Sequence, residues 1–311
     1  MNRGWIYRER VKAADAEQTV LDYYSRKYPH SDRSQWQNRI ESGRVLVNNS
    51  AVSPETILNV GESLEYHRQP WTEPQVPSFK ILYEDLDLLV VNKPSGLPVI
   101  PGGGFLEHTL LWQLKKSYPN QTPTPIHRLG RGTSGLLLLG RSQLAKSSLS
   151  AQMRHSTTGQ DRPLLSKVYR VLVRGNTISD RLTIKQPIGK IPHPRLGYIY
   201  GATHKGKYAH SESKVVRRYE NHTLLEVTIF TGRPHQIRIH LASVGYPLIG
   251  DPLYIAGGTF APIQKKQETI PVPGDCGYFL HAYRLSLVHP QTCKMLVFQC
   301  PVPLDWHELL D

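Results

Sequence analysis

The chain has 311 residues and a formal net charge of +13, and its hydrophobic content of 39% is ordinary for a globular protein. Its longest apolar runs are about four or five residues, well short of the roughly 20 needed to cross a bilayer, which excludes a membrane-spanning protein. Three widely spaced cysteines, Cys276, Cys293 and Cys300, match neither a disulfide framework nor a zinc site, and the charged N-terminus does not resemble a secretory signal. These features favour a cytoplasmic protein.

Residues 1–66 have the pattern of a small module that contains both helices and strands. Its predicted elements are helices over Ala14–Lys27 and Ser34–Ser42 and strands within Arg44–Val52 and Gly61–Tyr66. Ser34 is expected to cap the second helix and Gly43 to end it. Residues 67–78 contain three prolines and few aliphatic side chains, so they are predicted to form a linker.

Residues 79–311 are rich in predicted strands, with fewer helices. The predicted strands are Lys80–Glu84, Leu88–Asn92, Gly135–Gly140, Ser166–Val173, Ser213–Tyr219, Thr223–Phe230, Leu280–Val288 and Lys294–Gln299, and the predicted helices are Leu110–Tyr118, Ser142–Met153 and Pro234–Val244. Strands and helices do not alternate as in a doubly wound fold. The pattern therefore predicts an α+β domain with a mixed or antiparallel sheet.

The excess positive charge is concentrated in the middle of the chain. Residues 128–240 hold 20 Lys and Arg but only 5 Asp and Glu. A basic patch confined to a single segment favours a polyanionic partner, with nucleic acid as the leading candidate. A basic surface without such a partner is the alternative.

The segment Ile126–Gly135 opens this basic region just before a strand-like run of leucines. The guanidinium groups of Arg128 and Arg131 can each bind a phosphate through two hydrogen bonds. Gly130 and Gly132 allow backbone to approach a ligand closely. The segment contains no acid and no obvious nucleophile, so it is predicted to bind an anion.

A second segment, Thr231–Gly245, is predicted to run from a strand end into a helix that begins near Pro234. Arg233, His235 and Gln236 at the start of this helix form a candidate anion site. His235 and His240 are five residues apart, whereas a two-histidine zinc pair on a helix has a spacing of four. No metal site is therefore predicted.

These motifs, in their order along the chain, resemble the RluA-type family of RNA pseudouridine synthases. The matching segments are Leu82–Asp85 with Leu89–Leu97, Ile126–Leu129 with Thr133–Leu138, Lys167–Val173, Thr231–Leu241 with Gly250–Tyr254, and His281–Leu285 with His289-Pro290. The N-terminal module resembles the alpha-L RNA-binding motif at Ile40, Gly43, Val45, Val47-Asn48, Val52 and Gly61-Glu62. An alpha-L module followed by a linker is also the family's usual architecture.

The resemblance implies a reaction in which the C1′–N1 bond of a uridine in RNA is broken and the uracil is rotated and rejoined through C5, without cofactor or metal. The family uses an aspartate directly after the His-Arg-Leu motif, a position that Gly130 occupies in this chain. Three acids could replace it, namely Glu107, Asp161 and Asp251, although Asp251 has the pattern of a turn residue. The alternative is an inactive family member that still binds RNA.

The resemblance also assigns roles to other residues. Arg128 resembles the arginine that enters the RNA helix as the target base leaves, and Tyr169 resembles the aromatic residue that stacks on the uracil. Arg238 resembles the aspartate's partner, and with Gly130 in that position it is expected to face no carboxylate there. It is then expected to bind a phosphate, or a carboxylate supplied from elsewhere. His127, Arg131, Arg233 and His235 are expected to contact RNA.

The sequence as a whole predicts an α+β, pseudouridine-synthase-like domain at residues 79–311, preceded by an alpha-L RNA-binding-like domain at residues 1–66 and a linker at residues 67–78. The expected function is uridine isomerisation in ribosomal or transfer RNA, by a cytoplasmic monomer that needs no cofactor or metal.

Overall fold

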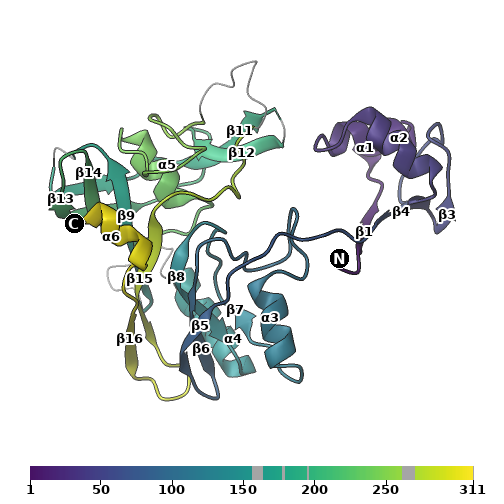
Figure 1. Cartoon of the computed structure of the whole chain (residues 1–311). Coiled ribbons are helices and arrows are strands. Elements are labelled where there is room, and N and C mark those ends of the chain that lie inside the picture. Colours follow the sequence, from purple (N-terminus) through teal and green to yellow (C-terminus); the bar gives the residue numbers. More distant parts are fainter. Residues whose placement is uncertain (156–163, 177–178, 195, 261–269, 311) are drawn as a thin grey trace. The chain divides into compact units, whose positions relative to one another are not determined.

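The structure, a computed structural model, describes residues 1–155, 164–176, 179–194, 196–260 and 270–310 (Figure 1). The chain divides into two compact units, Met1–Glu73 with Pro192–Ile199, and Pro74–Ile191 with Tyr200–Asp311. Helices and strands are both present and the larger sheet is mixed, which confirms the predicted α+β class. No helix in the described part of the chain is long and apolar enough to cross a membrane.

The first unit contains a four-stranded antiparallel sheet in the order β1-β4-β2-β3, with two helices. Its elements are β1 (Trp5–Arg10), the 3-10 helix η1 (Ala13–Asp15), α1 (Val20–Lys27), α2 (Arg33–Glu41), β2 (Val45–Val47), β3 (Ser50–Ala51) and β4 (Ser63–Arg68). Its core is rich in aromatic side chains, with Tyr23, Tyr24 and Trp36 buried between the helices and the sheet. Strand β1 pairs with β4 along its full length and was not predicted.

Both helices of this unit begin at other residues than predicted. The first predicted helix is interrupted, because residues 13–15 form a 3-10 turn and α1 starts only after Thr19, whose hydroxyl accepts from the backbone N–H of Asp22. The second helix is capped by Asp32 and not by Ser34. The Asp32 carboxylate accepts from the backbone N–H of Gln35, whose side chain accepts from the N–H of Asp32, which forms a capping box.

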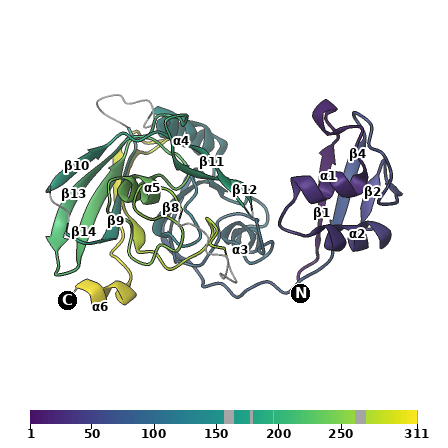
Figure 2. The ribbon, with the colours of Figure 1, turned by 90° about the horizontal axis from the view of Figure 1, so that it is seen from above.

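The second unit is built on one large sheet, which has ten strands among the described residues. Eight of the strands follow one another across the sheet in the order β10-β13-β14-β9-β15-β8-β6-β5, while β16 pairs with β15 and β7 pairs with β8. The strands are β5 (Lys80–Glu84), β6 (Leu88–Lys93), β7 (Thr124–Pro125), β8 (Ser134–Gly140), β9 (Ser166–Arg174), β10 (Arg181–Ile184), β13 (Ser211–Arg218), β14 (His222–Ile229), β15 (Leu280–Val288) and β16 (Met295–Gln299). Figure 2 shows β10, β13, β14 and β9 side by side.

The remaining elements are α3 (Leu110–Ser117), α4 (Gln143–His155), β11 (Ile188–His193), β12 (Gly197–Ala202), α5 (Gln236–Ser243), η2 (Leu304–Trp306) and α6 (His307–Leu310). Helices α3, α4 and α5 each bury apolar side chains in the core that also contains β6, β8, β9 and β15. Strands β8 and β15 run parallel at the middle of the sheet, while β15 is antiparallel to β9. This central junction brings the segment before β8 and the segment before β15 to the same edge.

Helix α5 begins two residues later than predicted, at Gln236. His235 is its N-cap and has a φ of 55°, so Pro234 lies before the helix and not in its first turn. The helix is buried on almost all sides, because residues 236–242 are all shielded from solvent. Arg238 is therefore held in a fixed position inside the domain.

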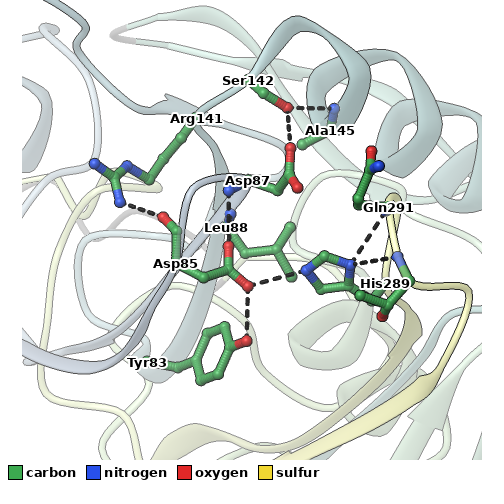
Figure 3. Close-up of polar contacts among 10 residues, drawn as sticks. Tyr83, Asp85, Asp87, Leu88, Arg141, Ser142, Ala145, His289 and Gln291 are labelled. Carbon is green, nitrogen blue, oxygen red and sulfur yellow. Dashed lines mark hydrogen bonds and ion pairs between the residues drawn. The ribbon is translucent and has the colours of Figure 1, made fainter.

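Asp85, in the turn between β5 and β6, joins three parts of the second unit (Figure 3). Its carboxylate accepts hydrogen bonds from the Tyr83 hydroxyl at 2.6 Å, from the backbone N–H of Leu88 at 2.6 Å and from His289 Nε2 at 2.9 Å. Burial alone would raise the pKa of Asp85, but these hydrogen bonds outweigh burial and lower it to about 2.

We expect the free energy of unfolding of Asp85→Asn to depend less on pH below about pH 4 than that of the unmodified protein. The pKa of Asp85 is lower in the folded state than in the unfolded chain, so its contribution is present above the unfolded pKa, about 4, and is lost as pH falls through about 2. Urea unfolding should show a loss of about 1–3 kcal/mol at pH 7 that shrinks below pH 4. Asp180→Asn, at a side chain that is 82% exposed, is the control. A loss that stays constant with pH would contradict this assignment.

Candidate active site

A cleft of about 690 Å³ opens in the second unit beside the junction of β8, β9 and β15. Its walls include all the site residues predicted from the sequence, namely His127, Arg128, Gly130, Arg131, Tyr169, Arg233, His235 and Arg238. The parallel pairing of β8 with β15 brings the segments before these two strands together, and residues 232–238, which follow β14, line the same cleft. The structure thus gathers the two predicted anion-binding segments in one place.

The cleft is strongly basic. Six Lys and Arg side chains line it, namely Arg128, Arg131, Arg154, Lys167, Arg233 and Arg238, and none of its described lining residues is Asp or Glu. Of the three acids considered from the sequence, Glu107 and Asp251 do not line the cleft, and Asp161 lies outside the described residues. The cleft is therefore suited to a polyanion.

The arginines of the cleft differ in how firmly they are held. Arg131 Nε donates to the carbonyl of Gly274 at 2.7 Å, and Arg233 Nε donates to the carbonyl of Tyr208 at 2.8 Å. Arg128 is exposed, and no described residue forms a hydrogen bond or ion pair with it. Arg128 is thus the side chain best able to move toward an incoming ligand.

The two histidines of the cleft are uncharged at neutral pH. Burial and the nearby Lys167 lower the pKa of His127, whose Nε2 accepts from the backbone N–H of Leu138 at 3.2 Å. Burial also lowers the pKa of His235 to about 4. The Tyr254 hydroxyl donates to a backbone carbonyl, so His235 Nδ1 donates to Tyr254, which leaves Nε2 as an acceptor.

Tyr169 lies on β9 with only 7% of its surface exposed, and its ring forms part of the cleft wall. Burial raises the pKa of its hydroxyl, so the side chain is neutral. An almost fully buried aromatic ring at the base of a basic cleft offers a face on which a planar ring can stack.

Arg238 does face a carboxylate, so of the alternatives considered for it the structure shows the carboxylate supplied from elsewhere. Asp251 binds it in a two-point ion pair, with Nε to Oδ2 and Nη2 to Oδ1 both at 2.7 Å, and the two side chains are 2% and 1% exposed. Asp251 also accepts from the backbone N–H groups of Leu253 and Tyr254, so it is a turn residue as well. The sequence motif showed Asp251 but could not show its distance from a helix 13 residues earlier.

Lys93 holds the turn that contains Arg131 from inside the domain, a role that was not predicted from the sequence. It is fully buried, and its Nζ donates to the carbonyls of Pro94 and Leu97 at 2.9 Å and of Arg131 at 3.2 Å. The Arg131 carbonyl also accepts from the backbone N–H of Gly96. The buried amino group, whose pKa burial lowers to about 7, thereby fixes the backbone next to Gly130 through its hydrogen bonds.

Tyr278 was also missed from the sequence. It precedes β15, is 6% exposed, and lies over Arg238 with the guanidinium carbon 4.2 Å from the ring centroid. Its position beside Gly130 and Gly132 depends on how the segment before β15 packs, so no local signal in the sequence indicated it.

Comparison with known proteins agrees with this geometry. Residues 87–243 match the family model described as RNA pseudouridylate synthase. A Synechocystis protein named as an uncharacterized RNA pseudouridine synthase is 47% identical over 285 residues, covering 91% of this chain and 94% of that protein. The ribosomal large subunit pseudouridine synthase D of Neisseria meningitidis is 33% identical over 291 residues, covering 91% of this chain and 75% of that protein.

A solved structure has the same fold. Human RNA pseudouridylate synthase domain containing 1 superposes with a TM-score of 0.55 at 23% identity, over 75% of this chain and 87% of that one. The family model covers half of the chain, and the relatives cover most of it. The chain therefore belongs to the RluA-type family of RNA pseudouridine synthases, isomerases that convert uridine in RNA to pseudouridine.

Proposed function

We propose that this isomerase acts on ribosomal RNA and draws the target uridine out of its helix into the cleft. The observation that carries the proposal is the cleft itself, which combines six cationic side chains with a buried aromatic ring. Cations hold the phosphates of the backbone, and an aromatic face accepts a base that has left its stack.

Each predicted site residue has a role in this proposal. Tyr169 stacks on the extruded uracil, and the mobile Arg128 fills the gap that the base leaves in the RNA helix, which offsets part of the few kcal/mol that extrusion costs. Arg131 and Arg233, anchored to backbone carbonyls, bind phosphates. His127 and His235, both neutral, contact the nucleotide without adding charge.

Gly130 stands, by this proposal, where the family places its aspartate. Its φ lies outside the left-handed region, so a side chain at this position is compatible with the backbone. Asp251 adjoins the site through its partner Arg238, but both its oxygens are bound and it is not among the residues that line the cleft. We infer that Asp251 holds Arg238 in place and does not react with the substrate.

Ribosomal RNA is proposed over transfer RNA because a relative that is 33% identical, over an alignment covering 91% of this chain, is named for the large ribosomal subunit. Mapping pseudouridine in cellular RNA with and without this gene tests the proposal. A uridine in ribosomal RNA that loses its modification supports it, and a loss confined to transfer RNA contradicts the choice of substrate. Unchanged modification, with RNA still bound by the protein, would favour the inactive RNA-binding alternative.

The proposed domain organisation is a module at residues 1–66, a linker at residues 67–78 and a catalytic domain at residues 79–311, in a cytoplasmic monomer. The N-terminal module has its own core, which supports independent folding. It is proposed to tune which RNA is bound. A fragment of residues 78–311 that cannot fold would show that the boundary is misplaced.

RNA binding should depend strongly on salt. If about five phosphates are neutralised, affinity should fall by roughly 10²–10³-fold between about 50 and 200 mM salt. Arg233→Gln, which removes a cation proposed to bind a phosphate, should reduce the slope of log affinity against log salt by about 1. The control Arg218→Gln removes a cation that pairs with Asp180 and does not line the cleft. Equal affinity at both salt concentrations would contradict the electrostatic part of the proposal.

A further inference from the structure

The ring of Tyr278 fills the space that Gly130 and Gly132 leave open. A Cβ on Gly130 would lie 3.0 Å from the Tyr278 hydroxyl oxygen. A Cβ on Gly132 would lie 2.9 Å from two carbons of the same ring. The hydroxyl of Tyr278 therefore occupies the place into which a side chain at position 130 would extend.

The Tyr278 hydroxyl is bound only weakly by other described side chains. Its described hydrogen-bond partner is the Thr133 hydroxyl, at an oxygen–oxygen distance of 3.4 Å that is long for such a bond. The residue belongs to the cleft wall, whose described lining contains no carboxylate. Tyr278 thus offers an O–H group at the point where the site lacks an acid.

The ion pair of Arg238 with Asp251 lies beneath the Tyr278 ring, where the Arg238 charge can stabilise the deprotonated form of Tyr278. The Arg238 guanidinium carbon is 4.2 Å from the Tyr278 ring centroid, close enough to stabilise negative charge on the phenol oxygen and ring. Arg238 is itself held by Asp251 and by the carbonyl of Pro273, so it cannot turn away. The cation remains in position throughout a reaction.

We propose that Tyr278 carries the proton of the isomerisation in this chain, taking the place of the missing carboxylate at position 130; the inference rests on the proposed function. As the C1′–N1 bond breaks and its electron pair leaves with the uracil, the Tyr278 hydroxyl donates its proton to the uracil. The resulting phenolate faces the positive charge that develops at C1′. After C5 bonds to C1′, C5 releases its proton to the phenolate, and tyrosine is regenerated.

Proton and electron changes balance in this cycle without a cofactor. One proton leaves the phenol and one returns, and one C–N bond is exchanged for one C–C bond. Burial raises the pKa of Tyr278, with smaller effects in the same direction from Cys276 and Asp251 and in the opposite direction from Arg238 and Thr133. The side chain is consequently protonated at neutral pH, as a proton donor must be at the start.

Tyr278→Phe tests this role because it keeps the ring and removes only the oxygen. Single-turnover pseudouridine formation should fall by about 10²–10⁴-fold, while RNA affinity and thermal unfolding stay near those of the unmodified protein. Tyr118→Phe, whose hydroxyl bonds Glu84 outside the cleft, is the matched control. A Tyr278→Phe variant that reacts at the unmodified rate overturns the proposal.

A second measurement distinguishes proton transfer from a packing role. Placing 2,3,5-trifluorotyrosine, a much more acidic phenol, at position 278 of the full chain should make the single-turnover rate fall with rising pH in the neutral range, where the unmodified protein shows no such fall. An unchanged pH profile overturns the proposal. Failure of the unmodified protein to form any pseudouridine overturns the proposed function and this inference together, whereas an active protein that is insensitive at Tyr278 overturns this inference alone.

Discussion

Replacing Asp251 with Asn is expected to lower the free energy of unfolding of the cleft-bearing unit by about 3–5 kcal/mol, because it leaves the Arg238 guanidinium buried without a counter-charge. The two side chains are 2% and 1% exposed, so water cannot take over the lost interaction. Urea unfolding followed by a spectroscopic signal of this unit measures the effect. The loss should be larger than that of any single substitution at the exposed rim of the cleft.

The double variant Arg238→Met with Asp251→Leu separates pairing from packing. It removes both charges, and its stability should exceed that of Asp251→Asn because no charge is left buried alone. If Asp251 were instead the reacting acid, Asp251→Asn would abolish pseudouridine formation while the free energy of unfolding changed by less than about 1 kcal/mol. That combination would contradict the structural role assigned to Asp251.

The double variant Gly130→Asp with Tyr278→Phe is expected to form pseudouridine at least about tenfold faster than Tyr278→Phe alone. This gain is a small part of the 10²–10⁴-fold acceleration that a proton-transfer group supplies. The backbone at Gly130 accepts a side chain, and removing the Tyr278 hydroxyl relieves the 3.0 Å contact that a new Cβ would make. The carboxylate would then enter the region that the phenol oxygen occupied. Single-turnover assays on the same RNA measure the gain.

Gly130→Asn in the same Tyr278→Phe background is the matched control for this rescue, since it adds nearly the same volume without an ionisable group. It should remain as slow as Tyr278→Phe alone. Equal rates for the Asn and Asp versions would show that position 130 acts by filling space and not by supplying a base.

The sequence predicted most of the large sheet because its strands carry local signals. Runs such as Leu88–Val91 and Leu136–Leu139 are apolar throughout, and both proved to be buried central strands. Strands β1 and β10 were missed because they are exposed or short, and their pairing partners β4 and β13 lie far along the chain. Strands β11 and β12, which pair with each other, were also missed. The second helix begins earlier than predicted because two nearby residues, Asp32 and Ser34, are both suitable N-caps. Asp32 is the N-cap in the structure because its carboxylate accepts from the backbone N–H of Gln35.

The site was predicted in part because its motifs are contiguous in sequence. His127, Arg128 and Arg131 belong to one turn, and Arg233, His235 and Arg238 belong to another, so their shared chemistry was visible locally. The Arg238–Asp251 pair and the contact of Tyr278 with Gly130 depend on how a helix and the segment before β15 pack in three dimensions. No spacing rule along the chain encodes such contacts.

The central claim is that this chain forms pseudouridine although Gly130 occupies the position of the family's aspartate. Single-turnover conversion of a ribosomal RNA substrate by the purified, unmodified protein tests that claim most directly. Pseudouridine is read by chemical labelling of the RNA, and RNA binding is measured in the same samples. The account predicts that pseudouridine forms and that Tyr278→Phe slows its formation without weakening RNA binding. RNA that is bound tightly by the unmodified chain but keeps every uridine, while Gly130→Asp converts it, would contradict the account.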